Sequence, residues 1–135
     1  MTRLPSRIYD TSALVRVSNK EKGFENVAAL LHAGAANAAR EKASALSAFE
    51  FLFSIGKRGG EPAVKSLIYF QKILDFLPTD FETAQRAAFL KLKYPQLNLS
   101  MADAIILQTG IDNDFEIVTC DKVWAQVKEA KVTVV

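Results

Sequence analysis

Short apolar segments with strand character alternate along this chain with longer segments whose apolar residues recur at helical spacing. We expect strands at 8–10, 42–46, 115–121 and 131–135, and helices at 24–34, 48–58, 61–74, 79–94, 100–114 and 122–130. Such alternation is typical of a domain in which helices cover both faces of a largely parallel sheet. We therefore predict an α/β fold, namely a three-layer α/β/α sandwich with a mainly parallel central sheet.

Capping residues indicate where two of these helices begin and end. Thr79, followed three residues later by Glu82, predicts a capping box, and Ser100 predicts another helix start. Gly110 is expected to mark the far end of the helix that Ser100 begins. Asp103 then falls in the first turn of that helix, where the helix dipole favours an anion.

The size and composition of the chain are those of one compact domain. It has 135 residues, half of them hydrophobic, so we expect a single domain over 1–135 with a substantial core. A formal charge of +2 is too small by itself to indicate a nucleic-acid partner. Cys120 is the only cysteine, which excludes an internal disulfide and a multi-cysteine zinc site. We expect no signal peptide and no membrane span of ~18 apolar residues, and hence a cytoplasmic protein.

Four acids stand out because each borders or interrupts an apolar segment: Asp10, Glu50, Asp103 and Asp121. Asp10 and Asp121 end predicted strands, and Glu50 and Asp103 lie in the opening turns of predicted helices. In open parallel sheets the ligand site lies beyond the carboxyl ends of the strands, so we expect all four acids at one edge. Simpler interpretations stay open, since an Asp before a helix is often a cap and a helical Glu is usually solvated.

The stretches around these acids resemble the PIN domain family, and in particular VapC-type toxin ribonucleases. They are IYDTSAL around Asp10, SAFEFLF around Glu50, LSMADAIIL around Asp103 and IVTCDKVW around Asp121, and their order matches nearly end to end. The resemblance implies a PIN-like fold and a metal-dependent nuclease. It also implies that the four acids are both the catalytic residues and the metal ligands.

Ser12 and Thr119 occupy, by the same resemblance, hydroxyl positions that the family often uses beside its ligands. Independently of any family, two carboxylates ~4 Å apart repel by roughly 4 kcal/mol at an effective dielectric near 20, so converging acids need a cation or protons. Carboxylates without a histidine or thiolate nearby suit Mg²⁺ or Mn²⁺. We expect hydrolysis of an RNA phosphodiester by water that the metal activates, and by family analogy the product carries a 5′ phosphate.

Basic residues near the expected loops are candidates for contacts with the RNA backbone, namely Arg16, Lys57, Arg58 and Lys122. If metal neutralises the four acids, 17 bases face 11 acids, and the resulting +6 strengthens the attraction of phosphate. Taken singly, each base is more often just solvated.

Cys120 and His32 are not expected to act as a nucleophile and its base. A strand cysteine is usually a small buried hydrophobe, and His32 lies on a separate apolar helix with nothing to orient it. A phospho-acceptor receiver module is also disfavoured, because it needs an acidic pair after the first strand and IYDTSAL supplies one acid.

These features favour a Mg²⁺-dependent endoribonuclease of PIN type, the toxin of a toxin–antitoxin pair. A housekeeping PIN-type nuclease for RNA processing and a non-catalytic RNA-binding domain are the alternatives. The expected partners are RNA and an antitoxin protein that places an Arg or Lys among the acids. Apolar residues in and beside EPAVKSLIYFQKIL exceed what one small core needs, so we also expect a homodimer.

Overall fold

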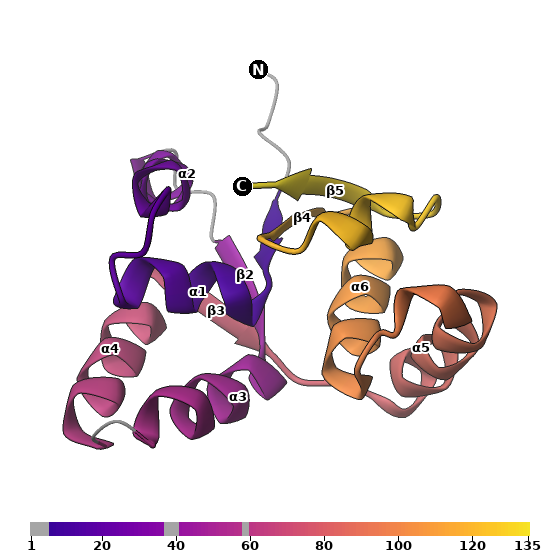
Figure 1. Cartoon of the computed structure of the whole chain (residues 1–135), viewed down its shortest axis with the longest axis horizontal. Helices are drawn as coiled ribbons and strands as arrows, with labels where there is room; N and C mark the ends of the chain where they lie inside the picture. Colours follow the sequence, from indigo (N-terminus) through magenta and orange to yellow (C-terminus); the bar gives the residue numbers. More distant parts are fainter. Residues whose placement is uncertain (1–5, 37–40, 58–59) are drawn as a thin grey trace.

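A parallel sheet forms the centre of the molecule (Figure 1). The structure, a computed structural model, describes residues 6–36, 41–57 and 60–135. Within these ranges five strands pair in parallel in the order β3-β2-β1-β4-β5. Their bounds are Arg7–Tyr9 (β1), Glu41–Ser44 (β2), Leu74–Leu77 (β3), Glu116–Thr119 (β4) and Lys131–Val134 (β5).

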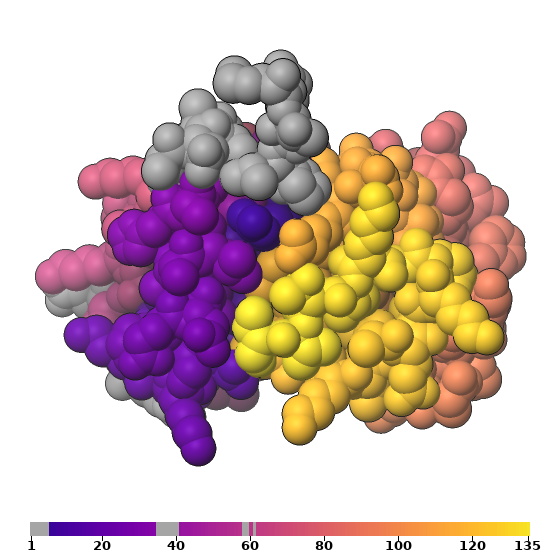
Figure 2. Space-filling view, turned by 90° about the horizontal axis from the view of Figure 1, so that it is seen from above, coloured from indigo at the N-terminus to yellow at the C-terminus, as the bar shows by residue number. Residues whose placement is uncertain are grey.

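Helices cover both faces of this sheet, which confirms the predicted three-layer α/β/α sandwich (Figure 1). On one side lie α1 (Thr11–Ser18), α2 (Phe24–Ala36), α3 (Ala45–Gly56) and α4 (Gly60–Ile73), and on the other α5 (Phe81–Lys93) and α6 (Met101–Asn113). Figure 2 shows α2 on one side of the molecule, with the C-terminal residues from β4 onward on the other. No helix in the described ranges combines the length and the hydropathy that crossing a bilayer requires.

The two layers have separate cores because neighbouring strand residues point to opposite faces of the sheet. Tyr9 and Val118 pack with the helices of the first side, in a core that includes Leu14 and Phe51. Ile8 and Ile117 belong to the core of the second side, together with residues of α5 and α6. The central strands β1, β2 and β4 are mostly buried, as parallel strands covered on both faces usually are, whereas the edge strands β3 and β5 are more exposed.

Two elements were missed from the sequence, α1 and β3. The segment TSALVRVS, which forms α1, is rich in hydroxyl and β-branched residues of weak helix propensity, and burial of Ala13 and Leu14 stabilises it. The predicted helix 61–74 ends at Ile73, and the run from Leu74 forms β3, an edge strand. Its polar residue Asp75 hid the strand pattern.

The helix signal at Ser100 was correct, whereas those at Thr79, Gly110 and Lys122 were wrong. Asp80, rather than Thr79, caps α5 by accepting the Thr83 amide at 2.8 Å. Gly110 lies inside α6, where a Cβ atom would collide with the Ile117 side chain, so this glycine permits close packing of helix on strand. The segment expected as a helix from Lys122 is a short 3₁₀ turn, Lys122–Gln126.

Candidate active site

The carboxyl ends of β1 and β4 lie together because these strands pair in parallel, with Tyr9 opposite Val118. Asp10 follows β1 directly, and its backbone amide donates to the Val118 carbonyl at 2.8 Å. Asp121 follows the last residue of β4 by two positions. Strand pairing therefore brings two of the four predicted acids to one edge of the sheet.

The Asp10 carboxylate is buried, with the residue only 5% exposed, and two hydroxyl groups bind it. Ser12 Oγ donates to Asp10 Oδ2 at 2.7 Å, and Thr119 Oγ1 donates to the same oxygen at 2.9 Å. Asp10 precedes α1, yet its side chain makes no capping hydrogen bond. Asp10 is thus the N-cap residue of α1 by position only, and its carboxylate is a buried hydrogen-bond acceptor for two side chains instead.

Backbone amides from the segment after β4 fix the direction of both hydroxyl groups. The Cys120 amide donates to Ser12 Oγ at 3.2 Å, and the Asp121 amide donates to Thr119 Oγ1 at 3.0 Å. Each hydroxyl oxygen thus accepts from an amide, and its own proton remains for Asp10. The hydroxyls of Ser12 and Thr119 thus hold the Asp10 carboxylate in one orientation.

Burial raises the pKa of Asp10 to about 6 from its usual 3.8. The Ser12 and Thr119 hydrogen bonds oppose this rise, while the carboxylates of Asp103 and Glu50 add to it. The fold therefore places three of the four acids close enough for their charges to interact. A cation among them would relieve both the repulsion and the cost of burying Asp10 in its ionised form.

Glu50 reaches this edge from α3 and is half-buried rather than solvated. Thr11 Oγ1 lies 2.7 Å from Glu50 Oε1 and 2.9 Å from Ser47 Oγ, so α1 and α3 are joined by polar contacts beside the carboxylate. Sequence reasoning missed Thr11 and Ser47. The available signal was the position of Thr11 between Asp10 and Ser12.

Asp103 is half-buried in the first turn of α6, and a capping box fixes it. The Ser100 amide donates to Asp103 Oδ2 at 3.0 Å, and the Asp103 amide donates to Ser100 Oγ at 3.0 Å. The expected cap is therefore present, and capping does not prevent the same carboxylate from facing a cation.

Asp121 is exposed and caps the 3₁₀ turn that follows it, accepting the Val123 amide on Oδ1 at 3.1 Å. Its link to the other acids runs through the Thr119 hydroxyl, which bonds both the Asp121 amide and the Asp10 carboxylate. Asp121 thus stands at the solvent side of the cluster.

Carboxylate oxygens suit a hard divalent cation. Within the described residues, however, no group of three or more Asp, Glu, His or Cys side chains is already arranged around one ion position. Hydrogen bonds hold Glu50 and Asp103 in their present orientations. Mg²⁺ usually keeps several waters and binds through one or two carboxylates. A hydrated ion could therefore contact Asp10 directly and the other acids through water.

Neither Cys120 nor His32 contributes a nucleophile or base to this edge. Burial raises the pKa of the Cys120 thiol, which keeps it protonated, and His32 is exposed on α2. The rejection of a Cys–His pair agrees with both observations.

A cavity of about 530 Å³ adjoins the acids between α1 and α3. Its lining includes Glu50 and Ser12 from the acidic edge, and Arg16, whose guanidinium donates to the Val135 carbonyl at 2.7 Å. Lys57 lies with its ammonium 4.3 Å from the centre of the Phe53 ring. These bases therefore lie on the cavity side of the site.

Two other bases were predicted to contact RNA. Lys122 is exposed and directly follows Asp121. Arg58 lies outside the described residues.

Comparison with known protein families shows to which family the chain belongs. A family model for the PIN domain matches residues 7–130, a span that contains all four acids. The chain belongs to the PIN domain family. PIN domains are nucleases, and the match covers almost the whole chain.

Solved structures with the same fold include several toxin–antitoxin proteins. VapBC2 from Rickettsia felis, solved bound to a promoter DNA fragment, has a TM-score of 0.80 and 17% identity over 95% of this chain and 97% of that chain. A toxin–antitoxin complex from Klebsiella pneumoniae has a TM-score of 0.71 and 20% identity over 96% and 97%. VapC20 from Mycobacterium tuberculosis, a toxin that cleaves the sarcin–ricin loop, has a TM-score of 0.74 and 15% identity over 94% and 98%. No curated protein matches the chain.

Proposed function

We propose that this PIN domain is a Mg²⁺-dependent endoribonuclease, with Mn²⁺ able to replace Mg²⁺, and that Asp10, Glu50, Asp103 and Asp121 form its catalytic metal site. The observation that carries the proposal is the buried Asp10 carboxylate, held by two oriented hydroxyls at the end of β1 and raised in pKa partly by two neighbouring acids. A buried structural carboxylate is usually paired with a cationic side chain, whereas among the described residues the side-chain bonds of Asp10 come from Ser12 and Thr119.

Each acid has a distinct part in this proposal. Asp10 is the central ligand, because its orientation is fixed and its ionisation is costly without a cation. Asp103 and Glu50 flank it from α6 and α3, and Asp121 closes the solvent side. When bound, a divalent cation lowers the pKa of a water and offsets the charge that develops on the phosphodiester. The chain positions the RNA phosphate and orients its carboxylates around that charge.

The test is cleavage of a single-stranded RNA by purified protein with and without Mg²⁺. Asp10→Asn removes the central charge while its amide oxygen can still accept both hydroxyl bonds, so cleavage should disappear from a folded protein. Asp114→Asn is the matched control. Asp114 is an exposed C-cap with φ 56°, a conformation that asparagine tolerates, so activity should be unchanged. Equal cleavage by the two variants would refute the site.

We further propose that the chain is the toxin of a toxin–antitoxin pair. The solved structures that resemble it support this proposal, because those of Klebsiella pneumoniae and Rickettsia felis contain toxin and antitoxin together. An antitoxin Arg or Lys inserted among the acids would form charge-assisted hydrogen bonds and exclude the cation. Expression of the chain alone should arrest growth and degrade RNA, and co-expression with its genomic neighbour should prevent both.

Other outcomes of that experiment would favour the alternatives. Normal growth together with cleavage by the purified protein would indicate a housekeeping RNA-processing nuclease. Binding of RNA without any cleavage would indicate a non-catalytic domain.

Homodimerisation is the remaining part of the proposal, and the exposed apolar residues support it. In the predicted segment EPAVKSLIYFQKIL, Phe70 is buried while Tyr69 is 50% exposed, so that segment is not wholly internal. A larger apolar face lies on α5, where Phe81, Phe89 and Leu92 are 81%, 63% and 74% exposed.

The α5 face is suited to a second copy of the same helix in antiparallel orientation. Its first turn carries Glu82 and its last turn carries Lys91 and Lys93, so antiparallel pairing would set acid opposite base at both ends. Contact between two copies of one surface is the usual arrangement in a twofold dimer.

A further inference from the structure

The cavity between α1 and α3 shares residues with the acidic edge and continues away from it. Glu50 and Ser12 line both, so a ligand held at the carboxylates has direct access to this space. Its volume of about 530 Å³ lies within the range of roughly 300–1,000 Å³ that is typical of small-molecule sites. The space therefore suits a compact group attached to whatever binds at the acids.

Aromatic side chains form one wall of the cavity. Phe49 and Phe53 on α3 are stacked with ring centroids 5.8 Å apart and planes within 6° of parallel. They remain 69% and 58% exposed, while Phe51 between them is fully buried. Two large exposed aromatic rings beside a catalytic edge are costly to leave in water and are a recurrent surface for stacking bases.

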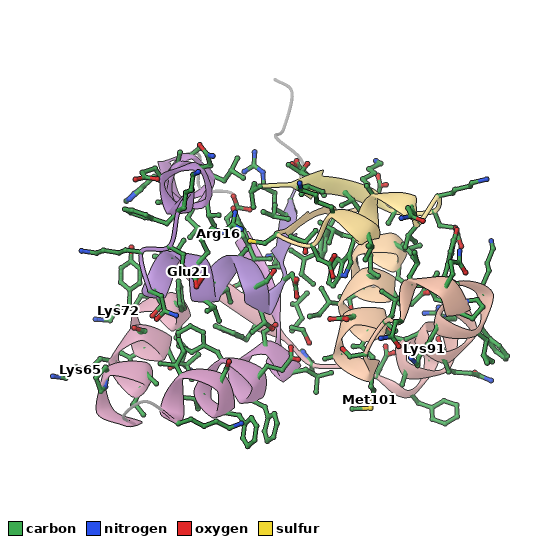
Figure 3. The ribbon with its side chains drawn as sticks, viewed as in Figure 1. Arg16, Glu21, Lys65, Lys72, Lys91 and Met101 are labelled. Atoms are coloured by element: carbon green, nitrogen blue, oxygen red, sulfur yellow. The ribbon has the colours of Figure 1, made fainter. Side chains whose placement is uncertain are left out.

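The rest of the cavity lining combines apolar and polar side chains. Val15 of α1 lines the cavity, as do Glu21, Arg16 and Ser54, which together provide hydrogen-bond acceptors and donors. Arg16 lies in the last turn of α1, and Glu21 follows that helix (Figure 3). Lys57, placed over the Phe53 ring, adds a positive charge at the end of the aromatic wall. Apolar walls with a few polar groups match the chemistry of a heterocyclic base.

We propose that this α1–α3 cavity binds one unpaired nucleobase of the RNA, that of a nucleotide adjacent to the cleaved phosphodiester. The inference rests on the proposed function, because the phosphate must lie at the acids for the base to reach the cavity. Only an unstacked base can enter, so the site selects single-stranded RNA and excludes a continuous duplex. Phe53 and Phe49 would then bind substrate without taking part in bond cleavage.

The test compares an oligoribonucleotide with versions that lack one base at a time but keep every phosphate. The cleaved bond is first mapped with the wild-type chain, and binding is then measured with Asp10→Asn protein, which does not cut. At one position next to the cut, removal of the base should weaken binding about tenfold, the loss expected for one stacked base. In the double variant Asp10→Asn, Phe53→Ala, removal of the same base should weaken RNA binding less than twofold.

Matched variants make the result specific to the cavity. Tyr69→Ala removes another exposed aromatic ring, on α4 and outside the cavity lining, and should keep the full tenfold dependence on the base. Phe53→Tyr keeps an aromatic ring in the wall, so this variant should show the tenfold dependence on the base that Phe53→Ala loses. Phe49→Ala tests the second ring independently.

Two results would overturn the inference. One is binding that ignores base removal at every position. The other is that removal of the base weakens RNA binding equally in Phe53→Ala and in its parent. This result would overturn the inference even if Phe53→Ala loses binding to an inhibitor protein or loses self-association. RNA that is cut normally in either case would leave the proposed function intact, whereas absence of both cutting and binding would refute that function itself.

Discussion

Replacement of Asp10 by Asn should stabilise the metal-free protein while it abolishes cleavage. The pKa of Asp10 is about 6 in the fold and 3.8 in a model side chain, chiefly because of burial. At about 1.4 kcal/mol for each factor of ten, this gap corresponds to about 3 kcal/mol of destabilisation whenever the carboxylate is ionised in both states. An Asn side chain has no such cost, and its amide oxygen can accept from Ser12 and Thr119.

The effect must depend on pH in a defined direction. A raised pKa in the folded state means that the wild-type protein is favoured when Asp10 is protonated, and that this advantage is lost as pH rises from about 4 through about 6. The stability gain of Asp10→Asn should therefore be close to zero near pH 4, and it should reach its maximum of about 3 kcal/mol above pH 7.

Urea unfolding in EDTA, followed by the fluorescence of the single buried Trp124, measures this difference. Asp114→Asn should stay within about 1 kcal/mol of wild type at every pH, since it removes only an exposed ion pair with Lys131. Asp10→Asn protein that is no more stable than wild type at pH 7, or a gain that does not vary with pH, would refute the electrostatic account of the site.

Three further predictions test neighbouring parts of the account. Mg²⁺ at one hundred times its dissociation constant for wild-type protein should stabilise the wild type by about 2.7 kcal/mol. If Asp10→Asn weakens binding tenfold or more, the same Mg²⁺ concentration should stabilise that variant by about 1.4 kcal/mol or less in thermal melts; equal shifts would place the ion elsewhere. Thr119→Val removes a hydrogen bond that lowers the pKa of Asp10, and it leaves the Asp121 amide without its acceptor. The acid limb of the pH profile for cleavage should therefore move to higher pH, and Thr119→Ser should have the wild-type profile. Leu92→Glu on α5 should convert the proposed dimer into a folded monomer in light-scattering measurements, and a wild-type chain that is already monomeric would contradict the dimer.

Local patterns were sufficient to predict most of the architecture. Ser100 and Asp103 form the capping box of α6, and this motif is recognisable from four consecutive residues. The apolar run before Asp10 and the run before Asp121 each gave one buried strand, because parallel strands covered on both faces are almost continuously hydrophobic. Elements stabilised mainly by tertiary packing were not predictable in this way, which is why α1 was missed.

The proximity of Glu50 and Asp103 to Asp10 could be predicted from the sequence, whereas the surroundings of these acids could not. Placement of Asp10 at a strand end follows from sequence pattern, but the amide bonds from Cys120 and Asp121 depend on how the chain leaves β4. The contact of Thr11 with Glu50 likewise joins residues 39 positions apart. No periodicity encodes such contacts, since they arise only when separate helices pack together.

The most direct test of the account is a titration with Mn²⁺, followed by the paramagnetic signal of the free ion, on wild-type, Asp10→Asn and Asp114→Asn proteins at pH 7.5. The account predicts saturable binding to the wild type and to Asp114→Asn, with the affinity of Asp10→Asn reduced at least about tenfold, as expected for the loss of a charged ligand. Equal affinity in all three proteins would show that the carboxyl edge around Asp10 does not hold the ion and would contradict the proposed catalytic site.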